Sequence, residues 1–178
     1  MIDTAEIPTV AQKNTVDANG DETITSEERA AFASDECAVV ASQQQLTVAG
    51  ETVAWQVSGS ELTYSPGAGG LQISRLDCRF TSDVDLSAPA TVAFVDSYLS
   101  DRLGWREITA TSEGVALDNP PVPAESRSDE LRVYPQALLS SPWINVKWSC
   151  RLRPAPVSQL GTRRHSKMSA ASLARSRN

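Results

Sequence analysis

Apolar residues recur at every second position from Leu46 onward, and this alternation constrains the fold more than any other feature of the chain. Stretches such as "ETVAWQVSG", "LQISRLDCRF" and "PATVAFVDSYL" alternate apolar with polar side chains and are separated by glycine or proline. Short strands with turn signals about every 8–12 residues are typical of a β-sandwich. We predict roughly seven strands, including a hairpin that turns at "SEG" and a last strand over "DELRVYPQALL".

A helix is predicted ahead of these strands, from about Ser26 to Gln44. Thr25 suits the N-cap, and Glu28 three residues later completes the sequence pattern of a capping box. Apolar residues near helical spacing predict one buried face; they are Ala30, Phe32, Ala33, Cys37, Val40 and Ala41.

Before this helix, Pro8 argues against a long first helix, so we expect at most two turns in that region. The predicted fold class is therefore α+β, with one EF-hand-like loop and helix packed on a mostly antiparallel β-sandwich-like domain. We assign residues 1–45 and 46–142 to the same domain and residues 143–178 to a basic tail without regular structure.

The stretch "DANGDETITSEE", Asp17 to Glu28, has the spacing of an EF-hand calcium loop. Its oxygen-bearing residues are candidate calcium ligands, with Thr23 contributing its backbone carbonyl: Asp17, Asn19, Asp21, Thr23, Thr25 and Glu28. The sixth position of such a loop requires a positive φ and is normally glycine, but here it is Glu22. We predict one weak, structural calcium site.

Two alternatives remain open for this loop. Glu27 and Glu28 can simply complement the helix macrodipole, in which case the stretch is only an acidic helix start. The domain is then a β-sandwich interaction module that binds no metal. EF-hands usually pair, and the chain contains no second loop of this pattern.

Charge is distributed unevenly along the chain. Residues 1–142 carry all 22 acidic residues and 8 of the 16 basic ones, whereas residues 143–178 carry the other 8 basic residues. The acidic part repels nucleic acid and attracts cations, so we expect no nucleic-acid partner. No apolar run is long enough to span a bilayer, and no secretory signal follows Met1, so the chain is expected to be cytoplasmic if made as given.

Cysteine and histidine usage limits the possible chemistry. Cys37 and Cys78 would form a disulfide in an oxidising compartment and would be buried thiols in a reducing one. The sole histidine, His165, lies in the basic tail, which makes thiol or serine catalysis improbable. A cluster of charged and aromatic residues over Asp96–Glu107 fits paired charges better than a catalytic surface. We therefore expect a non-enzymatic protein.

Several stretches together resemble one family. "MIDTAEIPTVAQ", "DANGDETITSEE", "PGAGGLQISRLDCRF", "FVDSYLSDRLGWREITA" and "SDELRVYPQALLSSP" occur in this order and span about Ile2 to Pro142. They look like the extracytoplasmic N-terminal domain of bacterial high-affinity nickel-transporter (nickel/cobalt permease) proteins. The most specific of these motifs are "GWREITA" and "SDELRVYP".

The resemblance implies an extracytoplasmic, β-rich accessory domain whose partner is a membrane transporter core or another membrane protein. In such relatives the loop is usually of the "DxDGDG" kind, which supports calcium here and marks Glu22 as a departure. The implied oxidising compartment favours a Cys37–Cys78 disulfide. The family's signal peptide and membrane helices have no counterpart in this chain, so we expect a truncated relative.

Overall fold

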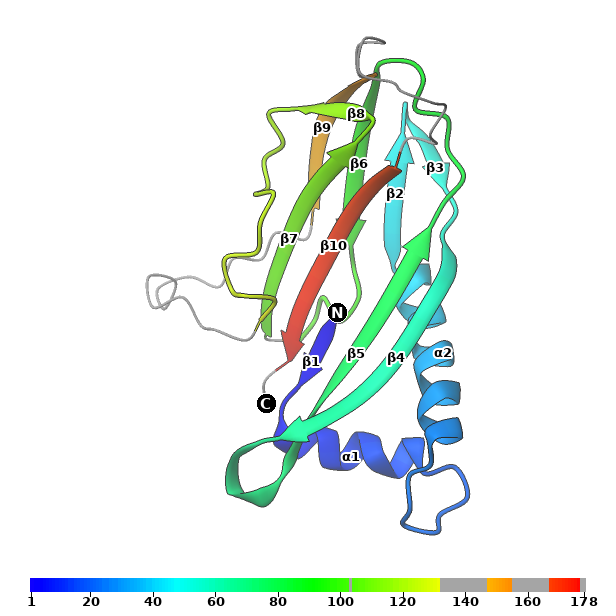
Figure 1. Cartoon of the computed structure of the whole chain (residues 1–178), viewed down its shortest axis with the longest axis vertical. Helices are drawn as coiled ribbons and strands as arrows, with labels where there is room; N and C mark the ends of the chain where they lie inside the picture. Colours follow the sequence, from blue (N-terminus) through cyan, green and yellow to red (C-terminus); the bar gives the residue numbers. More distant parts are fainter. Residues whose placement is uncertain (103, 132–146, 155–166, 177–178) are drawn as a thin grey trace.

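Two five-stranded β-sheets and two helices form the described part of the chain (Figure 1). The computed structural model describes residues 1–102, 104–131, 147–154 and 167–176. Every strand pairing within these residues is antiparallel except that of β1 with β10. The predicted α+β class, with a loop and helix on a mostly antiparallel, sheet-rich domain, is therefore confirmed.

The first sheet has the strand order β4-β5-β1-β10-β7. Its strands are β4 (Gln56–Pro66), β5 (Gln72–Thr81), β1 (Ile2–Thr4), β10 (Lys167–Ser176) and β7 (Gly104–Glu113). The hairpin of β4 and β5 turns through a short 3-10 helix over Ala68–Gly70, where Gly69 has a φ of 63°. Asp3 of β1 accepts two hydrogen bonds of 2.6 Å from the Arg75 guanidinium of β5, which ties the first strand to this hairpin.

The second sheet has the strand order β3-β2-β6-β9-β8. Its strands are β3 (Glu51–Val53), β2 (Gln44–Val48), β6 (Ala90–Asp96), β9 (Lys147–Pro154) and β8 (Val115–Asp118). The strands on either side of "SEG" belong to different sheets, because β7 pairs with β10 and β8 pairs with β9. The turn is where predicted, with Gly114 at a φ of 74°, but the prediction of a hairpin there is wrong.

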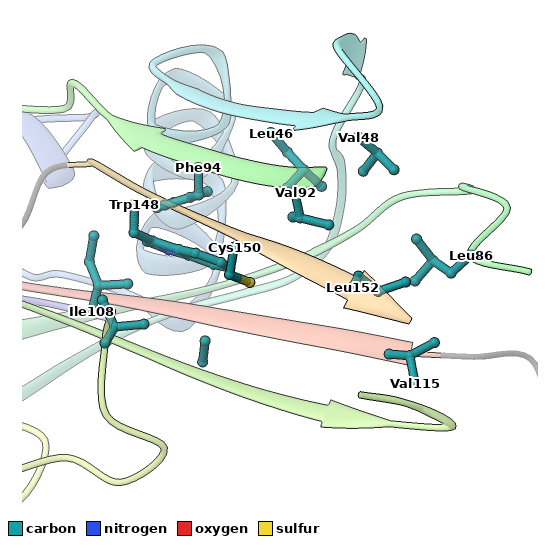
Figure 2. Packing of buried hydrophobic residues seen from close by; sticks show 12 residues of the cluster. Leu46, Val48, Leu86, Val92, Phe94, Ile108, Val115, Trp148, Cys150 and Leu152 are labelled. Carbon is teal, nitrogen blue, oxygen red and sulfur yellow. The ribbon is translucent and has the colours of Figure 1, made fainter. Parts of the chain in front are cut away.

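The larger hydrophobic core lies between the two sheets (Figure 2). Its buried side chains include residues of β2, β6 and β9 in the second sheet and of β7 in the first: Leu46, Val92, Phe94, Trp148, Leu152 and Ile108. Burying one such side chain contributes about 1.5–3 kcal/mol. This core therefore accounts for the face-to-face packing of the two sheets.

A second core joins the helices to the hairpin of β4 and β5. It includes Val16 of α1 (Glu6–Val16), three residues of α2 (Ser26–Ser42) and residues of the first sheet: Val16, Ala33, Cys37, Val40, Leu62 and Leu76. Figure 1 shows α2 beside β4 and β5, with α1 running across the lower end of the hairpin. The predicted helix with its capping box at Thr25 and Glu28 is confirmed.

Helix α1 is longer than we predicted from the presence of Pro8. We expected at most two turns because of Pro8, yet α1 covers 11 residues. Pro8 is the third residue of this helix, where a backbone N–H has no intrahelical partner in any case, so the missing donor costs little. The first helical hydrogen bond runs from the Thr9 N–H to the Ala5 carbonyl, one residue after the proline.

The expectation of a basic tail without regular structure is wrong for two described segments. Lys147–Pro154 forms β9 between β6 and β8, and Lys167–Ser176 forms β10 between β1 and β7. In β9, apolar Trp148, Cys150 and Leu152 alternate with exposed residues and point into the core. The basic residues of β9 thus lie on the opposite face of the strand and do not prevent its burial. Most of the predicted last strand, "DELRVYPQALL", lies outside the described residues.

Candidate metal-binding loop

The acidic loop connects the end of α1 to the start of α2, at the lower end of the molecule in Figure 1. Asp17 caps the C-terminus of α1, and its N–H donates to the Lys13 carbonyl at 2.9 Å. Thr25 caps the N-terminus of α2. Five of the six predicted ligands therefore lie between the two helices and Glu28 lies in the first turn of α2, which is the helix-loop-helix order of an EF-hand.

Asp17 organises the first half of the loop. Its Oδ1 accepts hydrogen bonds from the N–H groups of Gly20 (2.8 Å) and Asp21 (3.2 Å), and its Oδ2 accepts one from Glu22 (2.8 Å). Asn19 accepts a hydrogen bond from the Asp21 N–H at 2.9 Å and donates to the Asp21 carboxylate at 3.0 Å. These three predicted ligands therefore lie within one hydrogen-bonded turn.

Glu22 adopts the backbone conformation that the sixth position of an EF-hand loop requires. Its φ is +65°, a left-handed value that costs a residue with a Cβ about 1–2 kcal/mol. Gly20 also has a positive φ, at +72°. Glu22 therefore takes up this conformation without being a glycine, and it stores strain there.

Glu28 closes the second half of the loop. Its Oε2 accepts hydrogen bonds from the N–H (2.9 Å) and the hydroxyl (2.8 Å) of Thr25, and its Oε1 accepts one from the Ala18 N–H at 3.1 Å. The hydrogen bonds from the Thr25 backbone and side chain hold the pKa of Glu28 below its usual value. Glu28 therefore joins Thr25, the N-cap of α2, to the beginning of the loop.

The donor set suits calcium, although the described side chains are not gathered around one centre. Every candidate ligand atom is oxygen, the ligand type that Ca²⁺ prefers. Over the described residues, no three carboxylate, histidine or cysteine side chains come together as a metal-binding group. The Asp17 carboxylate accepts three hydrogen bonds, and a carboxylate has about four lone-pair sites, so Asp17 keeps capacity for one more contact.

A disulfide anchors the helix that follows this loop. Cys37 of α2 is bonded to Cys78 of β5, with a Cα–Cα distance of 5.5 Å. The sequence left open whether these two cysteines form a disulfide or stay buried thiols, and in the structure they form the disulfide. Because α2 begins at the last ligand candidates of the loop, the bridge also fixes the position of the loop relative to the first sheet.

Several members of the charged cluster over Asp96–Glu107 are paired with one another or with residues outside the cluster, as expected of paired charges. Arg106 is buried, lies 3.8 Å from the Asp96 carboxylate and donates to the Tyr98 carbonyl. The Tyr98 hydroxyl donates to Glu36 at 2.6 Å, and burial together with this contact raises the pKa of that hydroxyl. Glu107 accepts hydrogen bonds of 2.6 Å from the hydroxyl groups of Ser126 and Ser128. These contacts join β7 to the end of β6 and to the segment that contains Ser126 and Ser128, and they join Tyr98 to α2.

Sequence reasoning missed a second group of polar residues beside the acidic loop. Lys13, Arg29, Tyr64 and Gln72 come from α1, α2, β4 and β5 and line one cavity together with Asp17 and Glu22. No spacing pattern could reveal this group, because its members are brought together by the packing of the helices on the hairpin.

Comparisons of the chain with protein-family models, with curated proteins and with solved structures gave no match. The resemblance to the nickel/cobalt permease domain therefore stays a prediction. No helix in the described part of the chain is long and apolar enough to cross a membrane.

Proposed function

We propose that this protein is a non-enzymatic extracytoplasmic domain that holds one calcium ion structurally through the loop from Asp17 to Glu28. The observation that carries the proposal is the φ of +65° at Glu22. A glutamate retained in the conformation that an EF-hand loop needs at this position favours a function for that conformation. The ion would be held by Asp17, Asn19, Asp21, the Thr23 carbonyl, Thr25 and Glu28.

The disulfide between Cys37 and Cys78 supports the extracytoplasmic part of this proposal. Disulfides persist in oxidising compartments and are rare in the cytosol. A role as an accessory domain of nickel/cobalt transport, with a membrane protein as partner, rests on the resemblance of the motifs alone. No residue of the loop would transport nickel, because its ligands are all oxygen atoms suited to a hard cation.

A second candidate is an interaction module that binds no metal. It is favoured by the hydrogen bonds of Asp17 and Glu28, which close both halves of the loop through protein contacts. In this case the two carboxylates serve only as caps for backbone N–H groups. The two candidates differ in one measurable property, the response of the folded protein to calcium.

The test compares thermal unfolding in calcium, in magnesium and in a chelator, together with calorimetric titration. Extracellular EF-hand-like modules bind with a Kd of about 10⁻⁴–10⁻³ M. Calcium at about ten times the Kd would add about 1.4 kcal/mol, which raises the Tm by roughly 3–6 °C for a chain of this size. Magnesium should give a smaller shift, because it needs a more regular octahedral geometry.

Glu28→Gln is the decisive variant, because glutamine also completes a capping box but lacks the charge and the second carboxylate oxygen. We expect this variant to fold in chelator and to lose the calcium response. Asp85→Asn is the matched control, since Asp85 is an exposed residue that makes similar local contacts with Ser87 outside the loop. Equal Tm values in calcium and chelator, with no heat of binding, would rule out the calcium proposal and leave the metal-free module.

A further inference from the structure

A second cavity, of about 510 Å³, lies between the two helices and the turn that follows β6. It is lined by residues of β1, α1, α2, β5 and that turn, and none of its lining residues belongs to the acidic loop. Its volume falls in the range of small-molecule sites, about 300–1,000 Å³. The cavity is therefore a candidate site separate from the loop.

One part of the cavity wall is apolar. Phe32 of α2, Leu76 of β5 and Leu99 of the turn line it, and all three belong to the second core or pack against it. Ile7 of α1 also lines the cavity, and at 72% exposure it is the most exposed large apolar residue that the structure describes. A ligand with an apolar body would remove this side chain from water and contact the other three.

Two opposite charges line the same cavity and are not paired with each other. Glu36 lies one turn after Phe32 on α2, and Arg102 lies at the end of the turn that follows β6. In the part of the chain that the structure describes, neither side chain forms an ion pair. Glu36 is partly exposed and Arg102 is exposed, so a ligand in the cavity can reach both.

Tyr98 shows that these charges lie near one another. Its hydroxyl donates to one Glu36 oxygen at 2.6 Å, which leaves the other oxygen available to a ligand. Burial and the contact with Glu36 raise the pKa of this hydroxyl, and the positive charge of Arg102 partly opposes the rise. Both charges therefore act on the same hydroxyl group in the cavity wall.

The turn that carries Arg102 is strained next to the cavity. Leu99 has a left-handed φ of +50°, which is unfavourable for a residue with a Cβ. Its carbonyl accepts a hydrogen bond of 3.1 Å from the Arg102 N–H, so the strained residue and the arginine belong to one turn. Backbone strain of this kind is concentrated at ligand sites and switch regions.

We propose that this cavity binds a free amino acid with an apolar side chain. The α-carboxylate of the ligand contacts Arg102, its ammonium group contacts the second oxygen of Glu36, and its side chain covers Ile7 and Phe32. A zwitterion satisfies both charges of the cavity, whereas an anion would be repelled by Glu36 and a cation by Arg102. The site shares no residue with the calcium ligands and its test uses no calcium, so failure of one proposal leaves the other standing.

The first experiment is a calorimetric titration of the full chain, in chelator, with L-leucine, L-phenylalanine and glycine. The two apolar amino acids should bind saturably, and glycine should bind much more weakly because it lacks the side chain. Absence of saturable binding for both leucine and phenylalanine would overturn the proposal. Equal affinity for glycine would overturn the role given to the apolar wall.

Two derivatives of leucine separate the contributions of the two charges. Leucinamide lacks the carboxylate, as the first residue of a peptide does, and N-acetyl-leucine lacks the ammonium group, as the last residue of a peptide does. Each should bind about threefold to fivefold more weakly than leucine, because one exposed ion pair is lost. A derivative that binds as tightly as leucine would overturn the choice of a zwitterion and indicate the end of a peptide instead.

Variants assign each charge to its residue. Arg102→Gln should weaken the binding of leucine and leave that of leucinamide unchanged. Glu36→Gln, whose amide oxygen still accepts the Tyr98 hydroxyl, should weaken leucine and leave N-acetyl-leucine unchanged. Arg79→Gln on β5 and Glu61→Gln on β4 are the matched controls, because both residues are exposed and lie outside the cavity. Equal losses for leucine and its derivative in either cavity variant, or weaker leucine binding in a control, would contradict the assignment.

Discussion

The N–H of Glu22 donates to the Asp17 carboxylate at 2.8 Å, which closes the acidic loop across five residues. Glu22 itself has a left-handed φ of +65°. The loop thus combines a hydrogen bond that favours its conformation with a backbone strain that opposes it. A substitution of Glu22 can remove the backbone strain and leave the hydrogen bond in place.

Glu22→Gly should stabilise the protein by about 1 kcal/mol, because glycine adopts a positive φ without the steric cost of a Cβ. The hydrogen bond to Asp17 uses the backbone N–H and is retained. We expect the Tm in chelator to rise by roughly 2–4 °C. If the loop binds calcium, the same variant should also bind it more tightly, which calorimetry would measure.

The matched control for this variant is Ala18→Gly in the same loop, where φ is not in the left-handed region. Glycine there gains no relief of strain and adds freedom to the unfolded chain, so the Tm should stay unchanged or fall. An equal rise in both variants would show that strain at Glu22 is not the cause. A fall in Glu22→Gly would mean that its side chain stabilises the loop.

The pH dependence of stability should include a contribution from Glu28. Its pKa in the folded protein is below its usual value of 4.5, because the Thr25 N–H and hydroxyl favour the charged carboxylate. The folded state therefore binds the proton more weakly than the unfolded state. The resulting stabilisation is present above the unfolded pKa and is lost as the pH falls from there through the folded pKa.

Urea denaturation of the wild type and of Glu28→Gln, in chelator at about pH 7 and about pH 3, measures this contribution. Glutamine keeps the capping box at both pH values, so the loss of stability between them should be smaller in the variant. Glu27→Gln serves as the control, because it removes a carboxylate from the same helical turn but leaves the capping box intact. Identical pH dependence in all three proteins would contradict the role given to Glu28.

The local features of the loop and helix could be predicted because they depend on residues close in sequence. Thr25 and Glu28 form their capping box within one turn, and the ligand candidates share one loop for the same reason. The positive φ at Glu22 was expected because Glu22 is the sixth residue of the EF-hand spacing, although glutamate itself does not favour this conformation. Such features need no knowledge of which strands pair.

The strand pairing could not be predicted in the same way. Alternation indicates that a segment is a strand with one buried face, but it does not identify the neighbouring strand. The chain reverses at Gly114 and yet passes from one sheet to the other, so that β7 and β8 have different partners. Lys13 and Tyr64 likewise meet only because α1 packs near the hairpin of β4 and β5.

The disulfide should contribute strongly to stability, because it closes a large loop of the unfolded chain. Cys37 and Cys78 are 41 residues apart, a separation for which loop-closure entropy corresponds to roughly 4 kcal/mol. The variant with both residues changed to alanine should unfold at a correspondingly lower urea concentration. The free energy of unfolding comes from the midpoint and slope of the transition.

Reducing agent provides the control for this variant. It should lower the stability of the wild type and leave the double alanine variant unchanged, because the remaining cysteine, Cys150, is free. A similar effect of reductant on both proteins would show that the bridge is not the source of the difference. Wild-type stability that does not respond to complete reduction would contradict the contribution assigned to the bridge.

Because β9 lies in the core, we predict that a substitution of Leu152 strongly lowers the free energy of unfolding, although the sequence had assigned this residue to a tail. Leu152 is fully buried between the sheets, where it belongs to the same cluster as Val92 and Phe94. Leu152→Ala should cost about 2–5 kcal/mol through lost burial and the cavity left behind. Arg151→Ala, on the exposed face of the same strand, should change stability by about 0.5 kcal/mol or less. Because the two neighbours lie on opposite faces of the strand, equal and small effects in urea denaturation would mean that β9 does not fill this core.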